Sequence, residues 1–203
     1  MSARVVLLAG ASGSGKTSLT RRVGLPTLAL DDFYRDGDDA RRDPPLPMRF
    51  GIVDWDDPAS WDAQAALAAV ERLCRTGAAD VPVYDIPTSR RTGTARFDLG
   101  DSRVFVAEGI FAAELVPRLR ADPEVERLLA DALCLTLHPA VTFGRRLLRD
   151  LAEMRKPPLT LVRRGFALAR GERSLVARWI ALGCRPCSIP EAEAELRALA
   201  TER

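Results

Sequence analysis

Apolar and polar residues follow one another along this chain in blocks of two kinds. Short runs that are almost entirely apolar are typical of strands buried on both faces of a parallel sheet. They occupy residues 4–10, 27–33, 103–109 and 132–137, with a weaker fifth run at 187–189. Segments 15–22, 59–76 and 139–155 between them carry apolar residues at helical spacing or helix-start residues. Strands alternating with helices predict an α/β fold, with a parallel sheet of about five strands flanked by helices.

Two segments lack regular periodicity. Residues 34–58 are rich in Gly, Pro and Asp, and residues 77–102 include "VPVYDIPTSRRTG", which is compatible with a short hairpin beside a cleft. Irregular segments this long are usually functional or disordered. We therefore assign 34–58 and 78–100 as substrate-side insertions in one domain spanning residues 1–203. Residues 157–183 are predicted to be helical with a break at Gly171.

Composition narrows the choice of partner. The chain has 203 residues, 47% of them hydrophobic, and its 30 basic and 28 acidic residues give a formal net charge of +2. This balance argues against a general nucleic-acid partner and favours a small molecule. Neither a signal-peptide pattern nor an apolar run approaching about 18 residues is present, so we expect a cytoplasmic protein without a membrane partner. The sequence leaves the oligomeric state open, including a homo-oligomer.

The four cysteines include one C-x-x-C pair, Cys184 and Cys187 in "CRPC". No second pair accompanies it, and it does not open a helix after a strand as a redox motif would. We predict two ordinary thiols.

The stretch "GASGSGKTS", residues 10–18, follows the first strand and opens the first helix. Gly10, Gly15, Lys16 and Thr17 satisfy the phosphate-loop pattern G-x-x-x-x-G-K-[ST] in its required context. Backbone N–H groups of such a loop surround phosphates, the lysine reaches the terminal phosphates, and the threonine hydroxyl can ligate magnesium. The predicted nucleotide-binding residues are Gly10, Ser12, Gly13, Ser14, Gly15, Lys16, Thr17 and Ser18. The loop alone does not distinguish a motor, a GTPase, a regulatory module and a kinase.

Acidic residues end two of the other predicted strands. Asp31 and Asp32 end the second strand, and Glu108 ends the third. Ligands of an open parallel sheet bind at the carboxyl ends of its strands, so a carboxylate there can accept the proton of an attacking hydroxyl. Glu108 is placed to hold magnesium directly or through water. The alternative for Asp31 and Asp32 is that both cap the following turn.

Six segments, in order and with comparable spacing, resemble the uridine kinase-like family of P-loop kinases over roughly residues 5–156. They are "GASGSGKTS", "DDFYRD", "DWDDPASWD", "VPVYDIPTSR", "VFVAEGIFA" and "RRLLRDLAE". The resemblance implies a P-loop NTPase fold and transfer of the γ-phosphoryl group of ATP, with Mg2+, to a hydroxyl of a small acceptor. Uridine or cytidine, converted to the 5'-monophosphate, is the favoured acceptor. A different alcohol acceptor, or a non-catalytic ATP-binding regulatory protein, remains an alternative.

By this resemblance Asp31 matches the base that acts on the sugar 5'-hydroxyl, and Tyr34 stands beside the acceptor. Asp56 matches the aspartate that holds ribose hydroxyls, although its acidic cluster could equally cap a helix. Tyr84 matches an aromatic that lies against the base, with a plain core aromatic as the alternative. Arg91 is also predicted to bind the substrate.

Three positions depart from the family pattern and leave the acceptor open. Asp54 stands where the family has asparagine, and Asp57 and Ser89 stand where it has histidines. The Ser89 position is the one that helps to recognise uracil or cytosine.

The last segment is basic and predicted to be helical. Arg145, Arg146 and Arg149 can gather on one side of a helix, and charge of this kind can close over a triphosphate as a mobile lid. Arg146 and Arg149 match the family's R-x-x-R-D lid segment and are predicted to be catalytic, within a lid of about residues 139–158. The alternative is a solvated helix face.

Overall fold

The computed structural model describes residues 2–37, 44–49, 51–136 and 173–201. In chain order the elements are β1 (Arg4–Ala9), α1 (Lys16–Val23), β2 (Thr27–Ala29), a 3-10 helix (Leu30–Phe33), β3 (Met48–Arg49), β4 (Ile52–Val53), a 3-10 helix (Pro58–Ser60), α2 (Ala63–Thr76), β5 (Ala78–Asp85), β6 (Arg90–Asp98), β7 (Val104–Gly109), a 3-10 helix (Ala112–Leu115), α3 (Val116–Arg120), α4 (Pro123–Glu126), β8 (Leu129–Leu135), β9 (Arg185–Cys187) and α7 (Ile189–Thr201). Residues 173–181 are also helical.

A five-stranded sheet forms the centre of the molecule, in the order β2-β7-β1-β8-β9. All of its neighbouring strands pair in parallel. The α/β class and the number of strands are as the sequence predicted. Because the strands are parallel, the loop after β1 and the ends of β2 and β7 open at the same edge of the sheet.

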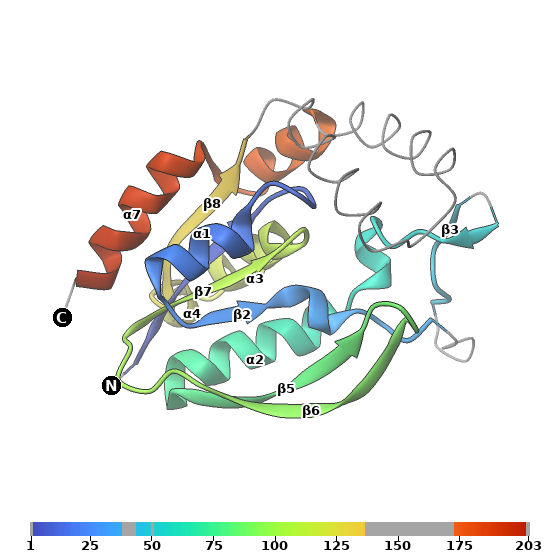
Figure 1. Ribbon diagram of the computed structural model, residues 1–203, viewed down its shortest axis with the longest axis horizontal. Coiled ribbons are helices and arrows are strands. Elements are labelled where there is room, and N and C mark those ends of the chain that lie inside the picture. Colours follow the sequence, from blue (N-terminus) through green and yellow to red (C-terminus); the bar gives the residue numbers. More distant parts are fainter. Residues whose placement is uncertain (1, 38–43, 50, 137–172, 202–203) are drawn as a thin grey trace.

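Helices cover both faces of this sheet (Figure 1). Val5, Leu7 and Ala9 of β1 face one core, which they share with α2 and α3. Val6 and Leu8 face a second core, which they share with α1 and α7. Burial on both faces explains why β1 is an unbroken apolar run rather than an alternating one.

The hairpin β5–β6 lies along α2, outside the main sheet (Figure 1). Its strands span eight and nine residues and pair antiparallel, so the hairpin is much longer than the short one expected in segment 77–102. The smaller hairpin β3–β4 falls in the segment 34–58 that was expected to be irregular.

The strand predicted at 27–33 is wrong in its second half. β2 ends at Ala29, and Leu30–Phe33 form a 3-10 helix. Other groups satisfy the carbonyl oxygens of this turn, since Leu30 O accepts from Trp61 Nε1 at 2.7 Å and Phe33 O accepts from Asp62 N at 2.9 Å. β2 is also an edge strand and pairs with β7 alone. Ending β2 early therefore removes backbone hydrogen bonds to one strand and not to two.

Other boundaries shift by a few residues. β8 begins at Leu129, three residues before the predicted start, and β9 spans Arg185–Cys187 rather than 187–189. α2 begins at Ala63 instead of residue 59, because Asp62 caps it by accepting from Ala65 N. The predicted lid, including Arg146 and Arg149, lies outside the described residues, as does Gly171.

The sequence did not predict α7, although its start carries a capping box. Ser188 Oγ accepts from Glu191 N at 3.4 Å, and the Glu191 carboxylate accepts from Ser188 N at 2.7 Å. This reciprocal pair satisfies two donors at the start of the helix.

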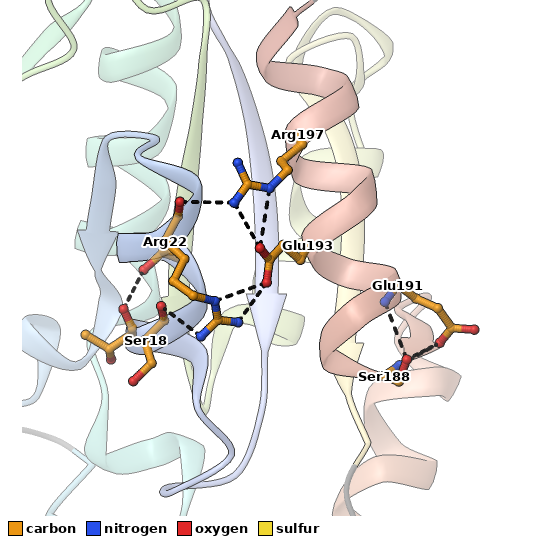
Figure 2. A network of polar contacts seen from close by, with 8 residues as sticks. Ser18, Arg22, Ser188, Glu191, Glu193 and Arg197 are labelled. Atoms are coloured by element: carbon orange, nitrogen blue, oxygen red, sulfur yellow. Dashed lines mark hydrogen bonds and ion pairs between the residues drawn. The ribbon is translucent and has the colours of Figure 1, made fainter.

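Polar contacts join α7 to α1 (Figure 2). Glu193 on α7 accepts hydrogen bonds from Arg22 Nη2 at 2.8 Å and from Arg197 Nη2 at 2.9 Å. Arg197 also donates to the carbonyl oxygen of Arg22 at 3.3 Å. The two arginines, Arg197 foremost, hold the pKa of Glu193 below its usual range. The helix that follows the phosphate loop is thus braced from outside by α7.

Buried thiols lie where the chain passes from the sheet to α7. Cys134, Cys184 and Cys187 are buried and unpaired. Burial raises the pKa of Cys184 to about 12 and that of Cys187 to about 11. Raised pKa values disfavour the reactive thiolate, as expected for ordinary thiols.

Within the part of the chain that the structure describes, no helix combines the length and apolar character that crossing a membrane requires.

Two substitutions in α7 should separate packing from surface charge. Leu196 is fully buried in the second core, so Leu196→Ala is expected to lower the free energy of unfolding by about 2–5 kcal/mol. Glu193→Gln removes only contacts at the surface and is expected to change it far less. Denaturant unfolding of both variants measures the difference, and an equal loss would show that the ion network, rather than the apolar face, holds α7.

Candidate active site

The phosphate-loop motif forms the turn between β1 and α1. Gly13 and Gly15 adopt φ values of 81° and 93°, in the left-handed region that glycine enters without a steric penalty. α1 begins directly afterwards at Lys16, so its N-terminal N–H groups and dipole point toward the loop. This is the backbone geometry of an anion-binding helix start.

Two features of the loop fit a phosphate group. Ser14 is 1% exposed, and among the described residues its Oγ has no hydrogen-bond partner. Gly10 leaves room beside it, because a Cβ at that position would lie 2.6 Å from Ser14 Oγ and 3.1 Å from Lys16 Cδ. A buried polar atom without a partner is costly, so an oxygen-bearing ligand would satisfy this cradle.

Lys16 and Thr17 both reach toward the end of β7. Lys16 Nζ donates to the carbonyl oxygen of Gly10 at 2.9 Å and lies 3.7 Å from Glu108 Oε2. Thr17 Oγ1 donates to Glu108 Oε1 at 2.7 Å. The register pairs Leu8 of β1 with Glu108 of β7, so adjacent strands deliver these groups to the same edge.

The donors at this edge suit magnesium. The Thr17 hydroxyl and the Glu108 carboxylate are hard oxygen ligands in direct contact. The described residues contain no cluster of three His, Cys, Asp or Glu side chains able to hold a metal by themselves. Magnesium in phosphoryl-transfer sites typically needs only one or two protein oxygens beside the phosphates and water, so these two groups fit it.

Asp31 lies beside this group, at the start of the 3-10 helix that follows β2. Burial raises the pKa of its carboxyl above the ordinary value of 3.8; the nearby Lys16 opposes the rise, and Glu108 adds to it. The backbone N–H of Ile110 donates a hydrogen bond to it. A carboxylate with a raised pKa near a lysine can accept a proton in a water-poor site.

Gly109 permits this arrangement. A Cβ at that position would lie 2.9 Å from Leu30 Cβ and 3.0 Å from Asp31 Oδ1. Real Cβ atoms essentially never approach another atom as closely as the 2.9 Å to Leu30 Cβ, and Asp31 Oδ1 would also have to shift. The end of β7 therefore needs glycine for the Asp31 turn to pack against it.

Aromatic side chains gather next to the Asp31 turn. The Tyr34 ring lies 5.5 Å from Trp55, 5.8 Å from Tyr84 and 5.9 Å from Phe111, measured between centroids. Tyr34 Oη donates to the carbonyl oxygen of Trp55 at 3.1 Å. Tyr34 and Tyr84, which the sequence placed at the acceptor, thus lie together in one cluster.

The tip of the β5–β6 hairpin is held to the segment after Asp31. Burial raises the pKa of Asp32 above its ordinary value, and the nearby backbone N–H of Tyr84 opposes the rise. Gly37 N donates to Ser89 O at 2.8 Å, and Arg91 N donates to Asp36 Oδ1 at 2.6 Å. Asp36 and Gly37 therefore hold the hairpin tip, whereas Asp31 lies by the phosphate loop.

The acidic residues Asp54, Asp56 and Asp57 make different local contacts. Asp57 caps the 3-10 helix Pro58–Ser60 by accepting from Ala59 N at 2.8 Å. Asp54 Oδ1 accepts from Asp56 N at 3.3 Å. Neither this 3-10 helix nor α2 uses Asp56 as its cap, because Asp57 and Asp62 hold those positions.

Arg91 belongs to strand β6 of the hairpin. It lines a groove of about 690 Å³ between α2 and the hairpin, together with Phe33, Arg72, Pro82 and Thr94. Its contact with the substrate stays a prediction.

Comparison with known proteins connects this geometry to a family. A curated uridine kinase from Deinococcus deserti is 33% identical over 176 residues, which cover 82% of this chain and 77% of that enzyme. The chain belongs to the uridine kinase-like family of P-loop kinases. It is therefore a phosphotransferase for a small molecule with an alcohol group as acceptor, rather than a non-catalytic nucleotide-binding protein.

Other similarities are narrower. The inorganic pyrophosphatase TTM2 of Arabidopsis thaliana is 30% identical over 168 residues, but the chain spans only 21% of its length. A solved structure of a candidate fructose transport system kinase from Silicibacter sp. TM1040 matches with a TM-score of 0.63 and 20% identity, over 87% of this chain and 85% of that one. This likeness shows the fold. No family model matches the chain.

Two side chains of this uridine kinase-like site were missed by sequence reasoning. Trp55 stacks edge-on against Tyr34, and Arg35 ties several segments of the acceptor side together. Trp55 stands between two acids in "DWDDP", and Arg35 follows the "DDFY" motif directly. The sequence signal for both residues was their position, since an aromatic and a cation stand directly beside motif residues.

The effect of Asp31→Asn on thermal stability tests whether the pKa of Asp31 is raised. The stability that a raised carboxyl pKa contributes is fully present below the unfolded value of 3.8 and is lost as pH rises through the folded pKa. At neutral pH the folded protein therefore bears the cost of the buried charge. Asp31→Asn is expected to raise the thermal midpoint at pH 7, with the difference shrinking toward about pH 4.

Asp101→Asn removes an exposed acid and serves as the control. Scanning calorimetry at both pH values gives the comparison. A lower midpoint for Asp31→Asn at pH 7 would contradict a raised pKa.

Proposed function

We propose that this kinase transfers the γ-phosphoryl group of ATP, with Mg2+, to the 5'-hydroxyl of uridine or cytidine. The observation that carries the proposal is the position of Asp31. Its buried carboxylate lies close enough to Lys16 and Glu108 for both charges to act on its pKa. A proton acceptor beside a phosphate-binding lysine is what phosphoryl transfer to an alcohol requires.

Each group then has a separate task. The loop amides and Lys16 hold the phosphates, and Ser14 Oγ satisfies its missing hydrogen bond there. Thr17 and Glu108 would hold Mg2+, which when bound would supply positive charge next to the phosphate oxygens. Asp31 orients the acceptor hydroxyl and takes its proton. Arg146 and Arg149, which match the lid segment of the family, are proposed to stabilise the transferring group.

A nucleoside acceptor is supported by the aromatic cluster and by the Deinococcus deserti relative, a uridine kinase. Tyr34, Trp55 and Tyr84 supply apolar rings beside the Asp31 turn, against which a flat base can pack. Asp56 adds a carboxylate for sugar hydroxyls.

A different alcohol acceptor is the second candidate, and Ser89 favours it. Ser89 occupies the position of the base-reading histidine in the family. Its backbone has a φ of 54°, which residues other than glycine rarely adopt. Its Oγ donates to Ile86 O at 3.4 Å, and its carbonyl oxygen accepts from Gly37 N. The residue is thus engaged in forming the hairpin turn, which reduces its capacity to recognise a pyrimidine.

The deciding experiment measures ADP release from Mg-ATP with a panel of acceptors: uridine, cytidine, other nucleosides, pentose derivatives and pantothenate. We expect release with uridine and cytidine. Release with another alcohol instead would keep the chemistry and replace the acceptor. No acceptor-dependent release, with ATP still bound, would overturn the proposal.

Asp31→Asn is expected to lower turnover by about 10²–10⁴-fold, the usual effect of removing a general base, while ATP binding is kept. Lys16→Ala provides the blank for the assay. Near-normal turnover of Asp31→Asn would remove Asp31 from the role of base.

A further inference from the structure

Arg35 is a buried cation next to the proposed acceptor site, and phosphate chemistry does not explain it. The residue is 8% exposed. No described carboxylate lies within ion-pair distance of it, and its Nε is buried without a hydrogen-bond partner. Burying a guanidinium is unfavourable unless other groups compensate, so its contacts indicate what it is for.

Those contacts are backbone carbonyls of the substrate-side insertion. Arg35 Nη1 donates to Ala59 O at 3.0 Å, and Nη2 donates to Pro44 O at 2.8 Å. The backbone N–H of Arg35 donates to Ser60 O at 2.9 Å. Arg35, near the start of the insertion, therefore contacts Pro44 in its middle and the residues directly after its end, Ala59 and Ser60.

The same residue also meets the hairpin. Tyr84 Oη donates to the carbonyl oxygen of Arg35 at 3.1 Å. On the other side of the insertion, Trp55 O accepts from Tyr34 Oη at 3.1 Å and from Ser60 Oγ at 3.5 Å. Arg35 thus lies where the segment carrying Trp55 and Asp56 is tied to Tyr34 and Tyr84.

We propose that Arg35 is a positioning residue for the acceptor. Its guanidinium holds Pro44 and Ala59 so that Trp55 and Asp56 keep a fixed position relative to Tyr34. It does so without touching ATP or the reacting atoms. Charge-assisted hydrogen bonds from a planar fork suit this role, because they fix direction as well as distance. The inference rests on the proposed function in taking this side of the molecule as the acceptor side.

Two substitutions test it. Arg35→Met keeps the length and apolar volume of the stem and removes the donors, whereas Arg35→Lys keeps the charge and one hydrogen-bonding nitrogen. Arg35→Met should raise the KM of whichever alcohol the wild type phosphorylates by about tenfold or more. The KM for ATP and the kcat at saturating acceptor should stay within about twofold of wild type. Arg35→Lys should recover part of the loss.

Arg118→Met serves as the matched control, since Arg118 is exposed on α3. Unchanged acceptor KM in Arg35→Met would overturn the proposal. So would a parallel loss of ATP affinity and of thermal stability, which would assign Arg35 to the general structure instead.

Amide hydrogen exchange provides a readout that needs no activity. In Arg35→Met, amides of residues 52–61 should exchange faster while those of α1 keep their protection. If the wild type phosphorylates none of the alcohols, the proposed function fails, and exchange still decides the role of Arg35. Faster exchange confined to the insertion would support it, and unchanged exchange would refute it.

Discussion

The candidate site depends on one close approach, between Gly109 at the end of β7 and the Leu30–Asp31 turn that ends β2. β7 lies between β2 and β1 in the sheet, so its carboxyl end is where a side chain from the β2 turn can meet the loop that follows β1. A side chain at 109 would collide with Leu30 Cβ and Asp31 Oδ1. Without that contact Asp31 would have to move away from Lys16 and Glu108. Backbone packing, rather than any single polar interaction, therefore sets the distance between Asp31 and the phosphate loop.

That approach concentrates opposing charges. Two acids, Asp31 and Glu108, lie near one lysine, and burial raises the pKa of Asp31 despite the attraction of Lys16. A protein selected for stability alone would avoid this arrangement, since the carboxylate is least favourable at the pH where it must be ionised. Its retention beside the phosphate loop is understandable if the carboxylate accepts a proton during turnover.

The phosphate side of the site could be predicted from sequence, because the loop is contiguous: Gly10 to Thr17 contain both the glycines and the side chains that the geometry needs. Strands β1 and β7 were found for a similar reason, since burial on both faces leaves an apolar run. The 3-10 turn at Leu30–Phe33 was not, because the contacts that end β2 come from Trp61 and Asp62, thirty residues away in an unrelated pattern. The contacts of Arg35 with Ala59 and with Tyr84 also join residues far apart in sequence, so no local signal predicted them.

The two sides of the site are consequently held by different forces. Sheet pairing and glycine geometry fix the phosphate side. Hydrogen bonds hold the proposed acceptor side, and they join the segment after Asp31 to the insertion and to the β5–β6 hairpin. Substitutions in the insertion and the hairpin can therefore alter acceptor recognition without disturbing phosphate binding. Asp57 and Ser89 illustrate this freedom, since both family histidine positions now serve local structure, one as a helix cap and one in a hairpin turn. Arg35 holds this part of the chain through the backbone carbonyls of Pro44 and Ala59, which any sequence provides, so the side chains there can change without loss of these contacts.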